Sequence, residues 1–252
     1  MKNILILTSK TGGGHVSLAE ALRDLLVNTV QPEDTYHPNA IHDTNNAVIS
    51  IVDPQPPLFH LHYRLVSRDA LWLWAAEFRF LDTPDRSLLA HKIFARLMRH
   101  RLYALLDRVQ PDLIITTYPF LSYEVAYVLQ QRSSTIPLLM LFSDANSVHA
   151  SWLTEQRANA TFATTRETYK QALATGFAPE RLHLVGWPVR AQFYRSDLSN
   201  REKSNGKLTQ LNLLPNRYTI FLQGGGEGAT RIASTIENIL TSETLTNEVQ
   251  II

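Results

Sequence analysis

The chain has no cysteine among its 252 residues and no long apolar run. The first absence excludes disulfides, thiol catalysis and any metal centre with cysteine ligands, and it fits a reducing cytoplasm. No stretch approaches the roughly 18–20 apolar residues that span a bilayer, and the N-terminus reads as a strand, unlike a signal peptide. A formal charge of +1 gives no reason to expect a nucleic acid partner. We therefore expect a cytosolic or peripheral protein.

Short apolar runs alternate with helical patterns along most of the chain. This alternation predicts an α/β fold, a Rossmann-like parallel sheet with helices on both faces. Gly176 is expected just after a helix, at the position where glycine commonly ends one. The strands are expected at residues 4–8, 47–52, 113–117, 137–142, 160–163 and 182–185, with helices at about 16–26, 85–109, 121–131 and 166–174.

Three stretches give weaker patterns. Residues 55–80 are rich in aromatics and predict irregular structure. The long helix that follows is expected to pack through six apolar residues, Ile93, Phe94, Leu97, Leu102, Leu105 and Leu106. Residues 218–223 and 249–252 read as strands of a second unit. We expect a first domain over 1–196, a polar linker over 197–216 and the start of a second Rossmann-like domain over 217–252.

Two glycine triplets each follow a predicted strand. The first triplet, Gly12–Gly14, precedes His15. The second, Gly224–Gly226, precedes Glu227 and Gly228, near the expected start of a second helix. A strand that leads through glycines into a helix presents free backbone N–H groups to phosphates and hydroxyl-rich ligands. The first triplet lacks the Gly-x-Gly-x-x-Gly spacing of dinucleotide sites. Glu227 could equally be a first-turn acid that complements the helix dipole.

His15 is a candidate general base. A helix N-terminus lowers the pKa of a histidine, and a neutral imidazole at a ligand-facing loop can accept a proton. The alternative is a tight strand-to-helix turn with a capping histidine. The residues alone leave both open.

Further candidates follow later strands. Asp144 lies at the carboxyl end of a buried strand, where open α/β sheets bind ligands, although an aspartate there can also cap a turn. His149 follows within the same segment, where a histidine is more often structural than catalytic. Gly186-Trp187-Pro188-Val189-Arg190 also follows a strand and would place a cation near an interdomain cleft.

Five segments together resemble the monogalactosyldiacylglycerol synthases and related bacterial diacylglycerol glycosyltransferases. In chain order they are Thr11–His15, Pro111–Pro119, Ser143-Asp144 with His149 and Trp152, Gly186–Arg190 and Gly224–Gly228. The resemblance implies the N-terminal half of a GT-B fold, with an acceptor domain followed by a nucleotide-sugar domain. It implies hexose transfer from a UDP-sugar to diacylglycerol in glycolipid synthesis.

The resemblance also implies roles for single residues. His15 would deprotonate the acceptor hydroxyl, with Asp144 as a second catalytic residue. Gly224, Gly225, Gly226, Glu227 and Gly228 would bind the nucleotide sugar. Substrate contacts are expected from Thr11, Gly12, Gly13, Gly14, His149, Trp152, Pro188 and Arg190. No Asp-x-Asp triplet occurs, so we expect no metal and no cofactor, with the UDP-sugar as donor substrate.

The family's donor domain is expected to continue beyond Ile252, so we expect a truncated chain that is inactive alone. Alternatives are a lipid-linked cell-wall precursor glycosyltransferase and a non-catalytic lipid-binding module. The helix over 85–109 carries Lys92, Arg96, Arg99 and Arg101 but no acid between Ser87 and Leu106. This basic face predicts contact with an anionic membrane surface, on the inner face of the membrane.

Overall fold

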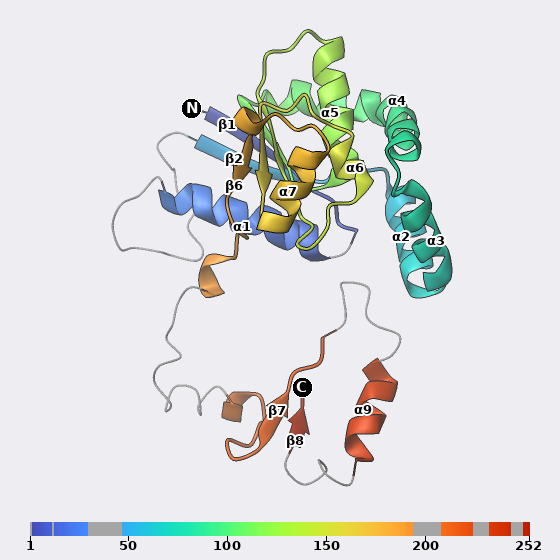
Figure 1. The fold of residues 1–252 in the computed structure, drawn as a ribbon. Coiled ribbons are helices and arrows are strands. Elements are labelled where there is room, and N and C mark those ends of the chain that lie inside the picture. Colours follow the sequence, from blue (N-terminus) through green and yellow to red (C-terminus); the bar gives the residue numbers. More distant parts are fainter. Residues whose placement is uncertain (1, 12, 30–46, 194–207, 224–231, 243–248) are drawn as a thin grey trace.

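The computed structural model describes residues 2–11, 13–29, 47–193, 208–223, 232–242 and 249–252 (Figure 1). Within these ranges six parallel strands form one sheet in the order β2-β1-β3-β4-β5-β6. The strands are β1 Lys2–Leu7, β2 Ala47–Val52, β3 Leu113–Thr116, β4 Leu138–Leu141, β5 Ala160–Ala163 and β6 Leu182–Leu184. The order reverses beside β1, which makes the gap between the ends of β1 and β3 the topological switch point of the sheet.

Helices cover both faces of this sheet. Alternate residues of β1 point to opposite faces, so Leu5 and Leu7 join the larger apolar cluster while Ile6 joins the smaller one. The larger cluster includes Met98 of α4, and the smaller one includes Ala19 of α1. The helices are α1 Gly13–Thr29, α4 Pro84–Val109, α5 Pro119–Gln131, α6 Ala150–Leu153 and α7 Arg166–Ala174. The Rossmann-like α/β fold predicted from the sequence is confirmed.

The aromatic stretch 55–80 is helical, which corrects the expectation of irregular structure. It forms α2, Pro57–Arg68, and α3, Leu71–Leu81, which stand beside α4 in Figure 1. α2 begins at a proline, whose fixed φ suits the first helical turn. The helical pattern was hard to recognise because α3 has no fully buried residue. Its apolar side chains are distributed between a cavity wall and the surface, in place of one core-facing stripe.

The packing face of α4 also differs from the expected one. Leu102 is buried as expected, but Ile93 is 49% and Leu97 63% exposed. The N-terminal half of α4 turns a different face inward, through the small or polar side chains of Ser87, His91 and Ala95. Because these buried residues are not large apolar ones, hydrophobic spacing misplaced the face.

Two smaller features agree with the sequence. Gly176 follows α7 with a φ of +95°, the left-handed conformation that favours glycine after a helix. β7, Tyr218–Ile220, pairs in parallel with β8, Val249–Ile251, and α9, Ile232–Leu240, lies between them in the chain. Most of the expected linker lies outside the described residues. The domain boundaries therefore stay predictions.

Candidate active site

The first glycine loop opens directly into α1. Gly13 and Gly14 are exposed at its start, while Gly12 lies outside the described residues. A Cβ placed on Gly13 or Gly14 would meet no heavy atom within 4 Å, and neither residue has a left-handed φ. Their backbone therefore does not require glycine in the described surroundings. Bare glycine at such a loop leaves room for another molecule to approach the backbone, which favours the ligand interpretation over a tight turn.

His15 lies at the switch point of the sheet. Its Nδ1 is 3.0 Å from the carbonyl oxygen of Thr117, the residue that follows β3. A carbonyl only accepts, so Nδ1 carries the proton and donates to it. The ring also meets Tyr118 edge to face, with centroids 4.9 Å apart. These contacts hold a neutral tautomer in which Nε2 is the proton acceptor, and within the described residues no hydrogen bond engages Nε2.

Burial lowers the pKa of His15 below its ordinary value of 6.5. The hydrogen bond to Thr117 and the negative charge of Asp144 act in the opposite direction, and burial outweighs them. The sequence interpretation attributed a lowered pKa to the helix dipole, whereas the structure gives desolvation as the main cause. The outcome for the chemistry is the same, because a neutral imidazole is the form that can accept a proton.

A hydrogen-bond network surrounds His15 and fixes its neighbour Tyr118. The Tyr118 hydroxyl interacts with Thr11 and Gln55, and burial raises its pKa. Ser9 donates to Gln55 Oε1 over 2.5 Å and lies 2.6 Å from the Thr11 hydroxyl. Thr11 was expected at the site from its motif. Tyr118 and Gln55 were not singled out, although they follow β3 and β2, the two strands that flank β1.

Asp144 and His149 lie on the other side of the site. Asp144 Oδ2 accepts the backbone N–H of His149 over 3.0 Å, so it caps a turn while remaining close enough to act on the charge of His15. Both ring nitrogens of His149 are engaged. Nε2 lies 3.0 Å from the Phe78 carbonyl and Nδ1 2.8 Å from the Ser151 hydroxyl. His149 thus joins α3 to α6, and its ring can contact a ligand only through its faces and edges.

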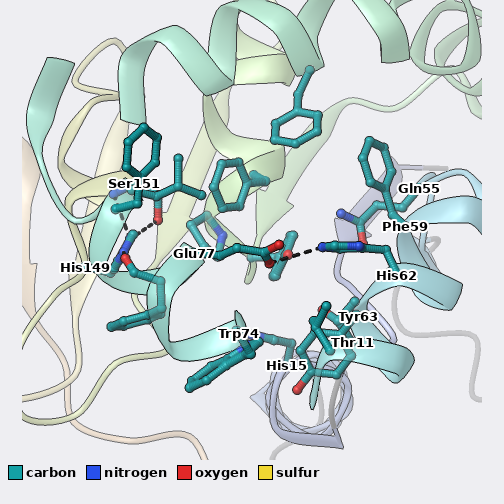
Figure 2. A pocket seen from close by; sticks show the side chains of 18 of the residues that line it. Thr11, His15, Gln55, Phe59, His62, Tyr63, Trp74, Glu77, His149 and Ser151 are labelled. Atoms are coloured by element: carbon teal, nitrogen blue, oxygen red, sulfur yellow. Dashed lines mark hydrogen bonds and ion pairs between the residues drawn. The ribbon is translucent and has the colours of Figure 1, made fainter. Parts of the chain in front are cut away.

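His15 on one hand, and Asp144 and His149 on the other, line the same cavity of about 510 Å³. His15 and His149 line it together with Thr11 and Gln55 (Figure 2). Most of the remaining wall is apolar and comes from α2, α3, α4 and the start of α5. These apolar residues are Phe59, Val66, Trp74, Phe78, Phe80, Leu81, Phe94, Met98, Pro119 and Phe120. The site therefore combines one polar end, which carries the candidate base, with a long apolar wall.

Gly13 and Gly14 do not line this cavity, and three further predicted substrate contacts also lie elsewhere. Trp152 has no exposed surface and packs in the core against Phe142, with centroids 5.4 Å apart. Its position suits support of the site and does not suit a direct contact, which corrects that expectation. Arg190 lies 3.5 Å from Glu20 of α1. Neither Arg190 nor Pro188 lines the cavity, and a role for them toward a second domain stays a prediction.

The second glycine loop, Gly224–Gly228, lies outside the described residues. Within the part of the chain that the structure describes, no three histidine, aspartate or glutamate side chains cluster as metal ligands do. The expectation of a metal-free reaction stays a prediction. In the same ranges no helix is both long and apolar enough to cross a bilayer.

Comparison with known proteins identifies the family. The sequence profile described as "Monogalactosyldiacylglycerol (MGDG) synthase" matches residues 15–189, a span that begins at His15 and contains Asp144. The chain belongs to the monogalactosyldiacylglycerol synthase family. The match contains five of the six strands of the sheet, all except β1.

Plant members of the MGDG synthase family align with nearly the whole chain. A probable MGDG synthase 2 from rice, Oryza sativa subsp. indica, is 28% identical over 93% of this chain and 48% of its own length. MGDG synthase 2 from Arabidopsis thaliana is 25% identical with the same coverage. Both are described as chloroplastic. The chain spans about half the length of these curated relatives.

Solved structures share the fold at low identity. Anabaena HepE in complex with UDP-glucose is 12% identical, with a TM-score of 0.54 over 100% of this chain and 69% of that one. The UDP-GlcNAc 2-epimerase of Neisseria meningitidis, bound to UDP-GlcNAc, is 11% identical, with a TM-score of 0.52 over 100% and 72%. These likenesses support the fold of this MGDG synthase family member independently of its sequence motifs.

Proposed function

We propose that this chain is the acceptor-binding part of a glycosyltransferase of glycolipid synthesis. It would bind diacylglycerol and present its free hydroxyl to a hexose carried by a UDP-sugar. The observation that carries the proposal is the position of His15, whose Nδ1 is held by Thr117 while its Nε2 has no partner among the described residues, beside an apolar cavity of about 510 Å³.

In this proposal His15 acts as general base. Its Nε2 takes the proton of the diacylglycerol hydroxyl as the oxygen attacks the anomeric carbon. The bond from that carbon to the UDP oxygen breaks, and the configuration inverts. General-base assistance of this kind contributes typically 10²–10⁴-fold to a rate. Asp144 opposes the pKa-lowering effect of burial and would stabilise the imidazolium that forms.

The apolar wall of the cavity suits acyl chains. Residues such as Phe59, Trp74 and Phe94 offer aromatic surface to them, and burial of apolar area contributes about 25 cal/mol per Å². The exposed glycine backbone at Gly13 and Gly14 would receive the polar part of a substrate. The UDP diphosphate is proposed to bind through Gly224–Gly228, without a metal or other cofactor, by backbone N–H groups and a helix dipole.

A lipid surface is the proposed source of the acceptor. Leu89, Ile93 and Leu97 follow one another at four-residue spacing on α4 and are 60%, 49% and 63% exposed. Lys92 and Arg96 lie beside them and are exposed. We name these five residues the α4 face. An apolar stripe flanked by cations is typical of helices that bind anionic bilayers. His91 is buried and does not belong to it. On this proposal the protein is peripheral, on the cytoplasmic face of the inner membrane.

Two measurements test the acceptor site and the chemistry separately. The first is binding of water-soluble dihexanoylglycerol to the 252-residue chain by calorimetry. The second is transfer of radiolabelled hexose from UDP-glucose or UDP-galactose to diacylglycerol. Because the chain spans about half the length of its relatives, transfer is measured with the chain alone and with a fusion that adds the C-terminal part of the rice relative.

His15→Asn is the decisive variant. The asparagine amide can still donate toward the Thr117 carbonyl but cannot accept a proton. We expect dihexanoylglycerol binding to remain within threefold of wild type and transfer by the active form to fall about 10²-fold or more. Normal transfer by His15→Asn would reject His15 as the base. Transfer to a polyprenyl-linked cell-wall precursor in place of diacylglycerol would reject the proposed acceptor.

A further inference from the structure

The charge of the cavity wall is one-sided. Among the described residues that line the cavity, two carry carboxylates, Asp144 and Glu77, and none is a lysine or arginine. Asp144 follows β4, whereas Glu77 comes from α3, from the helical wall on which neither the motifs nor the resemblance placed a functional residue. Figure 2 shows Glu77 directed into the cavity between His62 and His149.

Glu77 is held in place by one hydrogen bond. Its Oε2 lies 3.1 Å from Nε2 of His62 on α2. A neutral imidazole donates to a carboxylate without cancelling its charge. Trp74, one turn before Glu77 on the same helix, and Phe78, the next residue, also line the cavity. The Glu77 side chain is 37% exposed, so water reaches it from one side, and a second negative charge placed beside it in the cavity would be repelled.

Exposed cations lie outside the cavity, interspersed with the exposed acids Asp69, Asp82 and Asp85. Lys92 and Arg96 of the α4 face are exposed and do not line the cavity, and the same is true of Arg68 and Arg79 on α2 and α3. Anionic lipids would be attracted to the cations on the outer surface of these helices, and on entering the cavity they would meet carboxylates and, among the described lining residues, no lysine or arginine.

We propose that Glu77 is a specificity-determining residue that excludes anionic lipids from the acceptor cavity. This inference rests on the proposed function, in which the cavity receives diacylglycerol. A neutral glycerol hydroxyl enters freely. A phosphate monoester on the same oxygen brings negative charge into a cavity that offers no cationic side chain to pair with it, and such a like-charge contact discriminates strongly between otherwise similar ligands.

Three soluble lipids with hexanoyl chains separate charge from size. They are dihexanoylglycerol, its phosphate monoester (a short-chain phosphatidate) and the dimethyl ester of that phosphate, which is neutral but slightly larger. Binding to the 252-residue chain is measured by calorimetry at about pH 8, where a histidine of ordinary pKa is neutral. We expect dihexanoylglycerol and the dimethyl ester to bind within about threefold of each other, and the anionic monoester at least about tenfold more weakly.

Glu77→Gln keeps the size of the side chain and an oxygen that can accept from His62. We expect it to strengthen binding of the monoester by about tenfold and to leave both neutral lipids within twofold. Glu180→Gln is the matched control, because it makes the same charge change at an exposed position that does not line the cavity. Circular dichroism of each variant checks that the fold is retained.

The possible failures are distinguishable. If the dimethyl ester is excluded as strongly as the monoester, size decides and the inference is wrong. The inference is also wrong if Glu77→Gln binds the monoester as weakly as wild type does, or if Glu180→Gln strengthens monoester binding as much as Glu77→Gln does. In these cases the proposed acceptor site is not contradicted. If none of the three lipids binds wild type, the proposed function fails and the inference fails with it.

Discussion

The side chain of His15 is hydrogen-bonded to the backbone of Thr117, 102 residues further along the chain, with 3.0 Å between Nδ1 and the carbonyl oxygen. One residue follows β1 and the other follows β3, so the contact closes the switch point of the sheet. It fixes which ring nitrogen carries the proton. Within the described residues Nε2 has no hydrogen-bond partner, and the proposed function assigns it to the substrate.

The pH dependence of His15 follows from its burial. Because its pKa lies below the ordinary 6.5, we expect the His15 resonance in an NMR titration to change with a midpoint below pH 6.5. His15→Asn assigns the signal by removing it. In the unfolded chain His15 binds a proton more readily, so its contribution to stability is present above pH 6.5 and is lost as pH falls toward the lowered pKa. A midpoint at or above 6.5 would contradict the desolvated geometry.

The glycine loop can be tested for ligand contact. Gly14→Ala should not destabilise the fold, because an added Cβ meets no described atom, and alanine can stabilise a helix by up to about 1 kcal/mol. We expect dihexanoylglycerol binding or hexose transfer to weaken by tenfold or more, since the substrate loses its close approach to the backbone. Gly176→Ala is the opposite control. Its φ of +95° should cost about 1–2 kcal/mol and leave ligand binding unchanged. Normal binding and transfer by Gly14→Ala would show that the loop has a purely structural role.

The buried pair of His91 and Glu124 ties three helices together. Its two side chains have no exposed surface, and His91 Nδ1 lies 2.9 Å from Glu124 Oε1. His91 Nε2 lies 2.9 Å from the Ser151 carbonyl of α6. Burial raises the pKa of Glu124, and His91 acts against this. We expect Glu124→Ala to cost about 3–5 kcal/mol in chemical denaturation, because it leaves a buried polar ring without its partner.

Two further variants qualify that expectation. Glu124→Gln should cost clearly less, since its amide can still bond to Nδ1 of a neutral His91. Asp107→Asn breaks an exposed pair with Arg132, in which Asp107 is 60% exposed, and should change the midpoint of denaturation little. Equal costs for Glu124→Ala and Asp107→Asn would show that the buried pair has no special structural role.

The α4 face predicts membrane binding. The double variant Ile93→Asp and Leu97→Asp should abolish co-sedimentation with vesicles of phosphatidylcholine and phosphatidylglycerol, because it places charge in the apolar stripe. Replacing Lys92 and Arg96 by alanine should weaken binding at low salt and reduce its salt sensitivity, at about 1 kcal/mol per residue. Leu211→Asp, at a 57% exposed leucine outside this face, should have no effect. Unchanged sedimentation of the Ile93 and Leu97 variant would exclude the α4 face as the lipid contact.

The sequence was informative wherever the determining interactions are local. Strand and helix patterns reflect side-chain alternation and periodicity, so the six-stranded sheet, α7 and the turn at Gly176 could be predicted. The glycine loop placed His15 at the end of a strand, and five ordered motifs identified the family. The prediction of irregular structure for the aromatic stretch 55–80 was wrong for a physical reason. Its helices turn apolar residues toward a cavity and the surface, so no single buried stripe marks them.

The site itself was decided by tertiary structure. Nothing local to His15 specifies Thr117 as its partner, and the pKa shift arises from burial by distant segments. Gln55 and Tyr118 come together only because the strands that they follow, β2 and β3, flank β1 in the sheet, and Glu77 enters the cavity only because α3 folds back beside α4. Trp152 was expected to contact a ligand, but packing buries it in the core. Sequence by itself determined the strands of the sheet, most of the helices that cover it, the family and the identity of the candidate base. Long-range packing determined which His15 nitrogen lacks a partner among the described residues, what surrounds it and which charges face the cavity.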